Sequence, residues 1–103
     1  MFLVIYITFP DRDSAQRITR QLIEERLVAC ANVFPMSSTY WWQAQVESAD
    51  EWVGIVKTVP ANREAVERSV IALHPYDVPC IMHWAVSANA DYETWIETET
   101  RQT

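Results

Sequence analysis

The chain has 103 residues, half of them apolar, and this length suits one domain, expected over residues 1–103, rather than two. Its net charge is −6, from 14 acidic and 8 basic side chains. Nucleic acids and anionic membrane surfaces select clustered lysine and arginine, so a chain with one lysine and scattered arginines is expected to bind neither.

Residues 2–9, FLVIYITF, form an uninterrupted apolar, β-branched and aromatic run. Such a run predicts a central strand that is covered on both faces, or on one face and by an oligomer contact. The run is far shorter than the roughly 20 residues of a membrane helix, and it lacks the basic segment and the cleavage site of a signal peptide. A buried strand explains it better.

A helix is expected after this strand. Pro10 ends the strand, and Asp11, Asp13 or Ser14 can cap the helix that follows. Apolar side chains then recur at helical spacing and are expected to face the core: Ala15, Ile18, Leu22 and Ile23.

Residues 28–58 predict one β-hairpin that is too long for its domain. Each arm has about 13 residues and would extend about 40 Å at about 3.3 Å per residue. A compact body of this chain length is only about 35 Å across. The arms should therefore overhang the core and carry Tyr40, Trp41 and Trp42 toward the tip. Overhanging aromatic strands aggregate unless something pairs or covers them, and the simplest partner is another copy of the chain.

Two residues within the hairpin predict local irregularities. Pro35 lies in the first arm, where it predicts an interrupted ladder or an edge strand. Gly54, the only glycine, lies in the second arm. We interpret it as a bulge or a close approach of another backbone, unless it is simply a position without a side chain.

The second half of the chain predicts a helix, a strand and a final helix. Pro60 suits the first turn of a helix that ends at His74 because Pro75 follows. Residues 78–86 predict a strand with Cys80, Met82, Trp84 and Val86 on one face and Ile81, His83 and Ala85 on the other. The inward side chains of the two helices are expected to be Ala65, Val66, Val70 and Leu73, then Tyr92, Trp95 and Ile96 after a cap at Asn89 or Asp91.

This order of elements predicts an α+β fold. Strand–helix–strand occurs twice and a helix follows, which is the βαββαβ arrangement of ferredoxin-like sandwiches with a C-terminal helix added. Four antiparallel strands would present one face to two helices, and the opposite face would need a cover. The chain contains no third layer, so a partner subunit is again expected.

Several short segments together resemble the CutA family of divalent-cation tolerance proteins. They are Cys30-Ala31-Asn32 with Pro35, Ser38-Thr39-Tyr40-Trp41-Trp42, Glu47, Lys57-Thr58, His74-Pro75-Tyr76 with Val78-Pro79, and Tyr92 with Trp95-Ile96. The resemblance implies a ferredoxin-like protomer in a tight homotrimer, whose hairpins reach across to neighbouring subunits and extend their sheets. It also implies a role in copper or divalent-cation tolerance without an accepted catalytic reaction.

The chain departs from the family pattern at four positions. Ala44 stands near the hairpin tip, where members usually have glycine, and Cys80 stands where they often have glutamate. Some members are credited with copper ligands at a cysteine near the end of the first strand and at a histidine pair. Ile7 and Leu73 replace two of these, so only His74 remains.

Metal binding is the first functional hypothesis, and His74 is the only residue expected to contact the metal, copper or another divalent cation. The helix dipole favours a cation there, although His74 can equally be a structural cap. Cys80 and Met82 offer two soft sulfurs for Cu(I), or they pack as ordinary apolar side chains. His83 is expected to be a core or interface histidine.

A small polar ligand bound between subunits is the second hypothesis. Tyr40, Glu47 and Lys57 are the candidate pocket residues, with Lys57 as the donor, unless Glu47 and Lys57 simply pair. Trp41, Trp42 and Trp52 are the candidates for the trimer interface.

The sequence offers little for catalysis. No motif directs Cys30 toward a histidine, and one glycine cannot build a phosphate loop. We expect no enzyme and no organic cofactor.

The two cysteines are too few for a disulfide framework and indicate reduced thiols of a cytoplasmic protein. The expected function is stoichiometric cation binding by a rigid trimer. The alternative is a trimeric signalling or scaffold protein with an indirect metal phenotype.

Overall fold

A computed structural model describes residues 1–100, and residues 101–103, which end the expected domain, lie outside the described residues. The elements along the chain are β1 (Phe2–Phe9), α1 (Arg12–Glu24), β2 (Cys30–Trp42), β3 (Gln45–Thr58), a short 3-10 helix (Pro60–Asn62), α2 (Arg63–Leu73), β4 (Ile81–Val86) and α3 (Ala90–Glu99). Among the described residues, no helix is long and apolar enough to cross a membrane.

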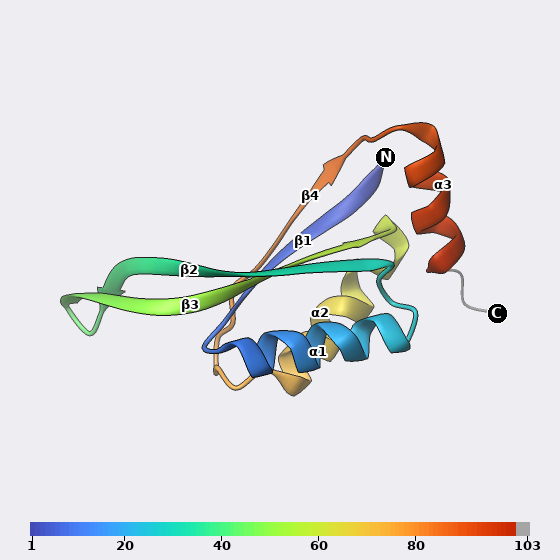
Figure 1. Ribbon diagram of the computed structural model, residues 1–103. Helices are drawn as coiled ribbons and strands as arrows, with labels where there is room; N and C mark the ends of the chain where they lie inside the picture. The colour runs from blue at the N-terminus through green and yellow to red at the C-terminus, as the bar shows by residue number, and fades with distance from the viewer. Residues whose placement is uncertain (101–103) are drawn as a thin grey trace.

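The four strands form one antiparallel sheet in the order β2-β3-β1-β4. Helices α1 and α2 lie together on one face of this sheet, and α3 lies at the end opposite the hairpin tip (Figure 1). This arrangement confirms the expected ferredoxin-like α+β fold with a long hairpin and a C-terminal helix.

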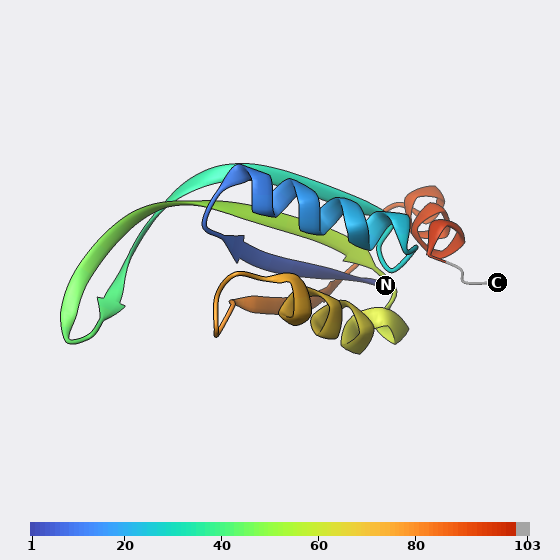
Figure 2. The same cartoon turned by 90° about the horizontal axis from the view of Figure 1, so that it is seen from below.

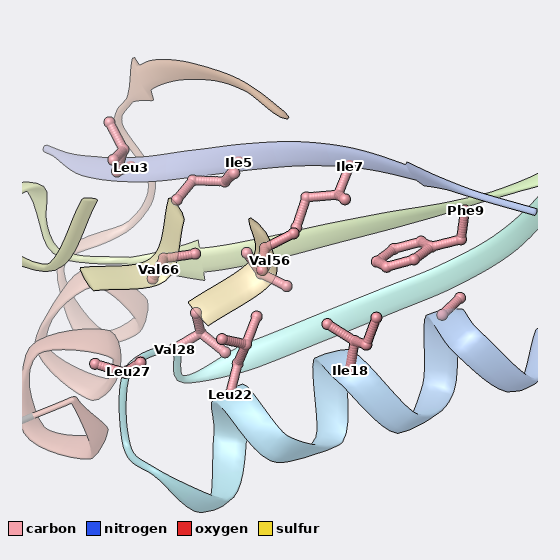
Figure 3. Packing of buried hydrophobic residues seen from close by; sticks show 12 residues of the cluster. Leu3, Ile5, Ile7, Phe9, Ile18, Leu22, Leu27, Val28, Val56 and Val66 are labelled. Atoms are coloured by element: carbon pink, nitrogen blue, oxygen red, sulfur yellow. The ribbon is translucent and has the colours of Figure 1, made fainter. Parts of the chain in front are cut away.

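The main core lies between the sheet and the two helices. Alternate side chains of β1 point into it and meet α1 and α2 (Figure 3). The labelled core residues on the strands and the two helices are Leu3, Ile5, Ile7, Phe9, Ile18, Leu22, Val56 and Val66. Each such side chain contributes about 1.5–3 kcal/mol by leaving water. On the other face, Phe2 and Val4 pack beneath Ile96 of α3, so one end of β1 is buried on both sides, as expected.

The first helix is capped as its sequence predicts. The Asp11 side chain accepts a hydrogen bond from the backbone N–H of Ser14 at 2.7 Å, which lowers the pKa of Asp11. One inward residue was predicted wrongly, because Ile23 is exposed and Thr19 is buried instead. The Thr19 hydroxyl donates to the Ala15 carbonyl at 2.7 Å, so its polar atom is satisfied inside the helix.

The hairpin projects beyond the body, as its length predicts. Strand β3 pairs with β1 only from Thr58 to Trp52, whereas it pairs with β2 all the way to Gln45. The molecule measures 46 × 25 × 20 Å, and the hairpin curves away past the end of β1 (Figure 2). The tip residues Gln43 and Ala44 have φ of 50° and 64°. Both are therefore in the left-handed region that favours glycine.

The two irregularities expected in the hairpin have different outcomes. Pro35 lies on β2, which is an edge strand, and the pairing continues through it, so the edge alternative is confirmed. The bulge at Gly54 was wrong, because the register there is continuous on both sides. A Cβ on Gly54 would lie 2.9 Å from Phe9 and 3.1 Å from Thr19. Side chains, and not another backbone, approach this glycine.

The last strand is shorter than expected, beginning at Ile81 instead of residue 78. Pro79 cannot donate a ladder hydrogen bond and restricts the backbone of Val78, which is 89% exposed. Within β4 the predicted faces are confirmed, since Met82 and Trp84 lie opposite Tyr6 and Val4.

Two assignments near the C-terminus need correction. His83 is exposed on an edge strand, so it is not a core histidine, and the alternative of an interface histidine stays a prediction. Trp95 is 42% exposed, whereas Ile96 alone on α3 is fully buried. Asn89 is the residue before α3, but its side chain makes no capping hydrogen bond.

Candidate functional site

His74 begins the loop that runs from α2 across the end of β1 to β4. The residue is only 8% exposed. Nε2 lies 2.6 Å from the carbonyl oxygen of Thr8, and Nδ1 accepts a hydrogen bond from the backbone N–H of Tyr76 at 3.1 Å. A carbonyl can only accept and a backbone N–H can only donate, so the ring is neutral and carries its hydrogen on Nε2.

Aromatic packing holds the His74 ring in place. It stacks on Phe9 with centroids 5.1 Å apart, and the Tyr76 ring lies 4.9 Å away on a tilt. The Tyr76 hydroxyl then donates to Oε2 of Glu51 at 3.0 Å. Burial, together with the hydrogen bond and the negative charge of Glu51, raises the pKa of Tyr76 to about 12. The loop is therefore joined to β3 at the stem of the hairpin, which is the region around Glu51 and Trp52 where β3 loses its pairing with β1.

The described part of one chain does not fit a metal ion by itself. Among residues 1–100, no group of three or more histidine, cysteine, aspartate or glutamate side chains could hold one. His74 already uses both ring nitrogens. Cys80 lies in the loop outside β4, and burial, followed by the charge of Glu51, raises the pKa of its thiol. Met82 is half-exposed on β4. Residues 1–100 of one chain therefore bring no such set of donors together.

The predicted ligand-pocket residues do not meet within one chain. Tyr40 and Glu47 lie opposite each other near the hairpin tip. Lys57 lies at the far end of β3, about 33 Å along the extended strand from Glu47. Lys57 donates instead to the Tyr92 hydroxyl at 3.1 Å, which raises the pKa of Lys57. The Glu47–Lys57 pair does not form within a chain, and a pocket between copies stays a prediction.

The three tryptophans named for the interface lie in different surroundings. Trp41 and Trp42 are 74% and 61% exposed near the tip. Trp52 is half-buried against the main core, and the Arg12 guanidinium lies 5.8 Å from the centre of its ring. Trp41 and Trp42 are therefore available to a partner, and Trp52 is largely used by its own chain.

The sheet face opposite α1 and α2 carries exposed apolar side chains, of which Met82 and Trp84 were placed together from the sequence and Phe34 was not singled out. Phe34, Met82 and Trp84 on this face are each at least 40% exposed. The Tyr6 hydroxyl donates to Sδ of Met36 at 3.4 Å across the same face. Alternation along β2 could have identified Phe34 as well, because residues opposite each other in register share a face. The Tyr76–Glu51 contact had no such signal, since it joins a loop to a distant strand.

The fold and the projecting hairpin define a ferredoxin-like protein with a largely uncovered sheet face. Residues 3–99 match the family described as CutA1 divalent ion tolerance protein, and the chain belongs to this family. It is 39% identical over 101 residues to the divalent-cation tolerance protein CutA of Pyrococcus horikoshii, covering 97% of this chain and 99% of that protein.

Solved structures agree with this assignment. The periplasmic divalent cation tolerance protein CutA from Archaeoglobus fulgidus superposes with a TM-score of 0.95 at 36% identity, covering 98% of this chain and all of that one. CutA1 from Oryza sativa superposes with a TM-score of 0.94 at 33% identity, covering 99% and 95%. One curated relative, from Arabidopsis thaliana, is named as chloroplastic.

Proposed function

We propose that this protein is a divalent-cation tolerance protein that acts as a rigid homotrimer and binds its cation, copper in particular, without turnover. The single observation that carries the proposal is the projecting hairpin, whose exposed Trp41 and Trp42 lie beyond the body. The names of the related proteins support the role in cation tolerance.

Assembly follows from what the single chain leaves uncovered. Beyond Trp52, strand β3 has β2 on one side and, within the described residues 1–100, no strand on the other. Unpaired backbone groups and exposed indole rings on the same ribbon make it a template for pairing. Exposed apolar side chains also lie on the sheet face opposite α1 and α2, at Phe34 on β2 and Trp84 on β4. Copies of the chain can cover both.

The cation then lies between copies. One described chain lacks a complete donor set, and a symmetric trimer presents each weak donor three times. Soft donors such as the Cys80 and Met82 sulfurs suit copper better than calcium or magnesium. Neither an enzymatic reaction nor an organic cofactor or a nucleic-acid partner is part of this proposal. The cytoplasmic location also stays a prediction.

Sedimentation equilibrium and calorimetric copper titration test the proposal together. We expect a trimer at micromolar concentration that binds copper stoichiometrically with submicromolar affinity. Trp41→Glu should lower the trimer population and copper binding in parallel, because truncating a buried tryptophan costs about 3–5 kcal/mol. Ile71→Glu is the matched control, since Ile71 is exposed on the outside of α2. A monomer at this concentration would refute the assembly.

A second candidate function is a trimeric signalling or scaffold protein that binds a small polar ligand. A shallow hollow of about 480 Å³ at the hairpin stem, lined by Pro35, Met36, Ser37, Asp50, Glu51 and Trp52, favours it. An intact trimer that binds copper weakly and without defined stoichiometry would support this candidate over the first.

A further inference from the structure

The position of His74 is incompatible with a free metal ligand. A histidine binds a metal through an unprotonated ring nitrogen, and the one such nitrogen here, Nδ1, already accepts from Tyr76. The other nitrogen is bound to the Thr8 carbonyl at 2.6 Å. A cation could reach this ring only by breaking one of these bonds and opening the packing against Phe9.

The same contacts form a connected chain of interactions. His74 holds the loop on β1 through Thr8 and orients the next turn through the backbone of Tyr76. The Tyr76 hydroxyl reaches Glu51. On β3, Glu51 is the first residue beyond the last pair with β1, which is Phe9 with Trp52. The contact therefore falls where the hairpin loses its neighbouring strand.

We propose that His74 is the anchor of a brace, formed by His74, Tyr76 and Glu51, that supports the hairpin where it leaves the sheet, and that His74 is not a cation ligand. A two-stranded ribbon is marginally stable by itself. The brace supplies the Tyr76–Glu51 contact at the point where β3 no longer has β1 beside it. It therefore helps to fix the direction in which the hairpin leaves the sheet. This inference needs neither the trimer nor copper binding to be correct.

The metal part is tested by nuclear magnetic resonance of the ring nitrogens. The chain has two histidines, so ¹⁵N labelling of histidine gives two rings to assign, and the exposed His83 is an internal control. We expect His74 to carry its hydrogen on Nε2 and to keep its shifts when stoichiometric Zn²⁺, a diamagnetic probe, is added. Zinc-induced shifts of the His74 nitrogens would overturn the inference, whatever His83 does. Absence of zinc binding anywhere would count against the proposed function alone.

The positioning part is tested by ultraviolet titration of the tyrosines. At about pH 11 a phenol with a pKa of about 12 is roughly one-tenth ionised, whereas one with the ordinary value of about 10 is roughly nine-tenths ionised. We expect His74→Gln to increase the phenolate absorbance at this pH, because the ring that positions Tyr76 beside Glu51 is lost, and Tyr76→Phe in the same background to abolish that increase. Circular dichroism must show that the variants are folded.

An unchanged titration in folded His74→Gln would overturn the positioning role. If His74→Gln does not fold, Glu51→Gln replaces it, because it keeps the shape of the acceptor and removes its charge. Folded Glu51→Gln is expected to lower the Tyr76 pKa, and an unchanged pKa would refute the brace. The zinc experiment on the unmodified protein remains decisive for the ligand question in either case.

Discussion

Gly54→Ala should destabilise the protein although alanine suits the backbone there. Gly54 does not have a positive φ, so no conformational reason requires glycine. The added Cβ would lie 2.9 Å from Cε2 of Phe9 and 3.1 Å from Cγ2 of Thr19. Carbon atoms in favourable contact are about 3.5–4.0 Å apart, so the Phe9 ring would have to retreat by roughly 0.6 Å.

The surroundings leave little room for that retreat. Phe9 is fully buried, and its ring stacks on His74 at 5.1 Å. Overpacking a well-packed core costs about 1–3 kcal/mol. Replacing glycine also restricts the unfolded chain, and this effect offsets roughly 0.4–1 kcal/mol of the overpacking cost. We therefore expect Gly54→Ala to lower the free energy of unfolding by about 1–2 kcal/mol.

Urea denaturation followed by tryptophan fluorescence measures this change, with every variant at the same protein concentration. The control is the double-mutant cycle with Phe9→Leu, which shortens the side chain that meets the new methyl group. Gly54→Ala should cost less in that background than in the parent. A Gly54→Ala protein as stable as the parent would refute the reasoning from contact distances.

Three further predictions concern the hairpin tip and the loop between α2 and β4. Ala44→Gly should raise the free energy of unfolding, measured by urea denaturation, by about 1 kcal/mol. The left-handed backbone at φ 64° costs an L-residue about 1–2 kcal/mol, and the greater freedom of glycine in the unfolded chain offsets part of this gain. An unchanged urea midpoint would contradict this prediction. Folding raises the pKa of Tyr76 from 10.0 to about 12, so the folded state binds the phenol proton more tightly than the unfolded state does. The resulting contribution to the free energy of unfolding is complete below pH 10 and is lost as the pH rises toward 12. Urea midpoints measured across this range should fall less steeply in Tyr76→Phe than in the parent, and equal slopes would count against it. The raised pKa of the Cys80 thiol should show in its reaction with maleimide, measured in the Cys30→Ser variant so that only Cys80 reacts. Because the thiolate is the reacting form, the rate should increase about tenfold per pH unit up to pH 9.0 and beyond. A rate that levels off at a lower pH would exclude the raised pKa.

Local features of the fold could be predicted from the residues because their causes lie within a few positions of the chain. The run of residues 2–9 became β1 with the same bounds. The Asp11 cap and the helix end at His74 before Pro75 depend on neighbours only three or four residues away. The projection of the hairpin follows from the lengths of its arms compared with the size of the body. The spacing of apolar residues, the capping residues and the length of an element are each properties of a single segment, so they can be read from its own sequence.

Only the tertiary structure decided which distant side chains meet. Gly54 is a glycine because Phe9 from one strand and Thr19 from a helix converge on it, and no pattern in its own strand shows this. His74 had a plausible metal role in the sequence, but packing of the loop over β1 uses both of its nitrogens. The physical reason is the same at both positions. A segment's own sequence determines its local conformation and its inward face, whereas free space and hydrogen-bond partners depend on where other segments come to lie against it.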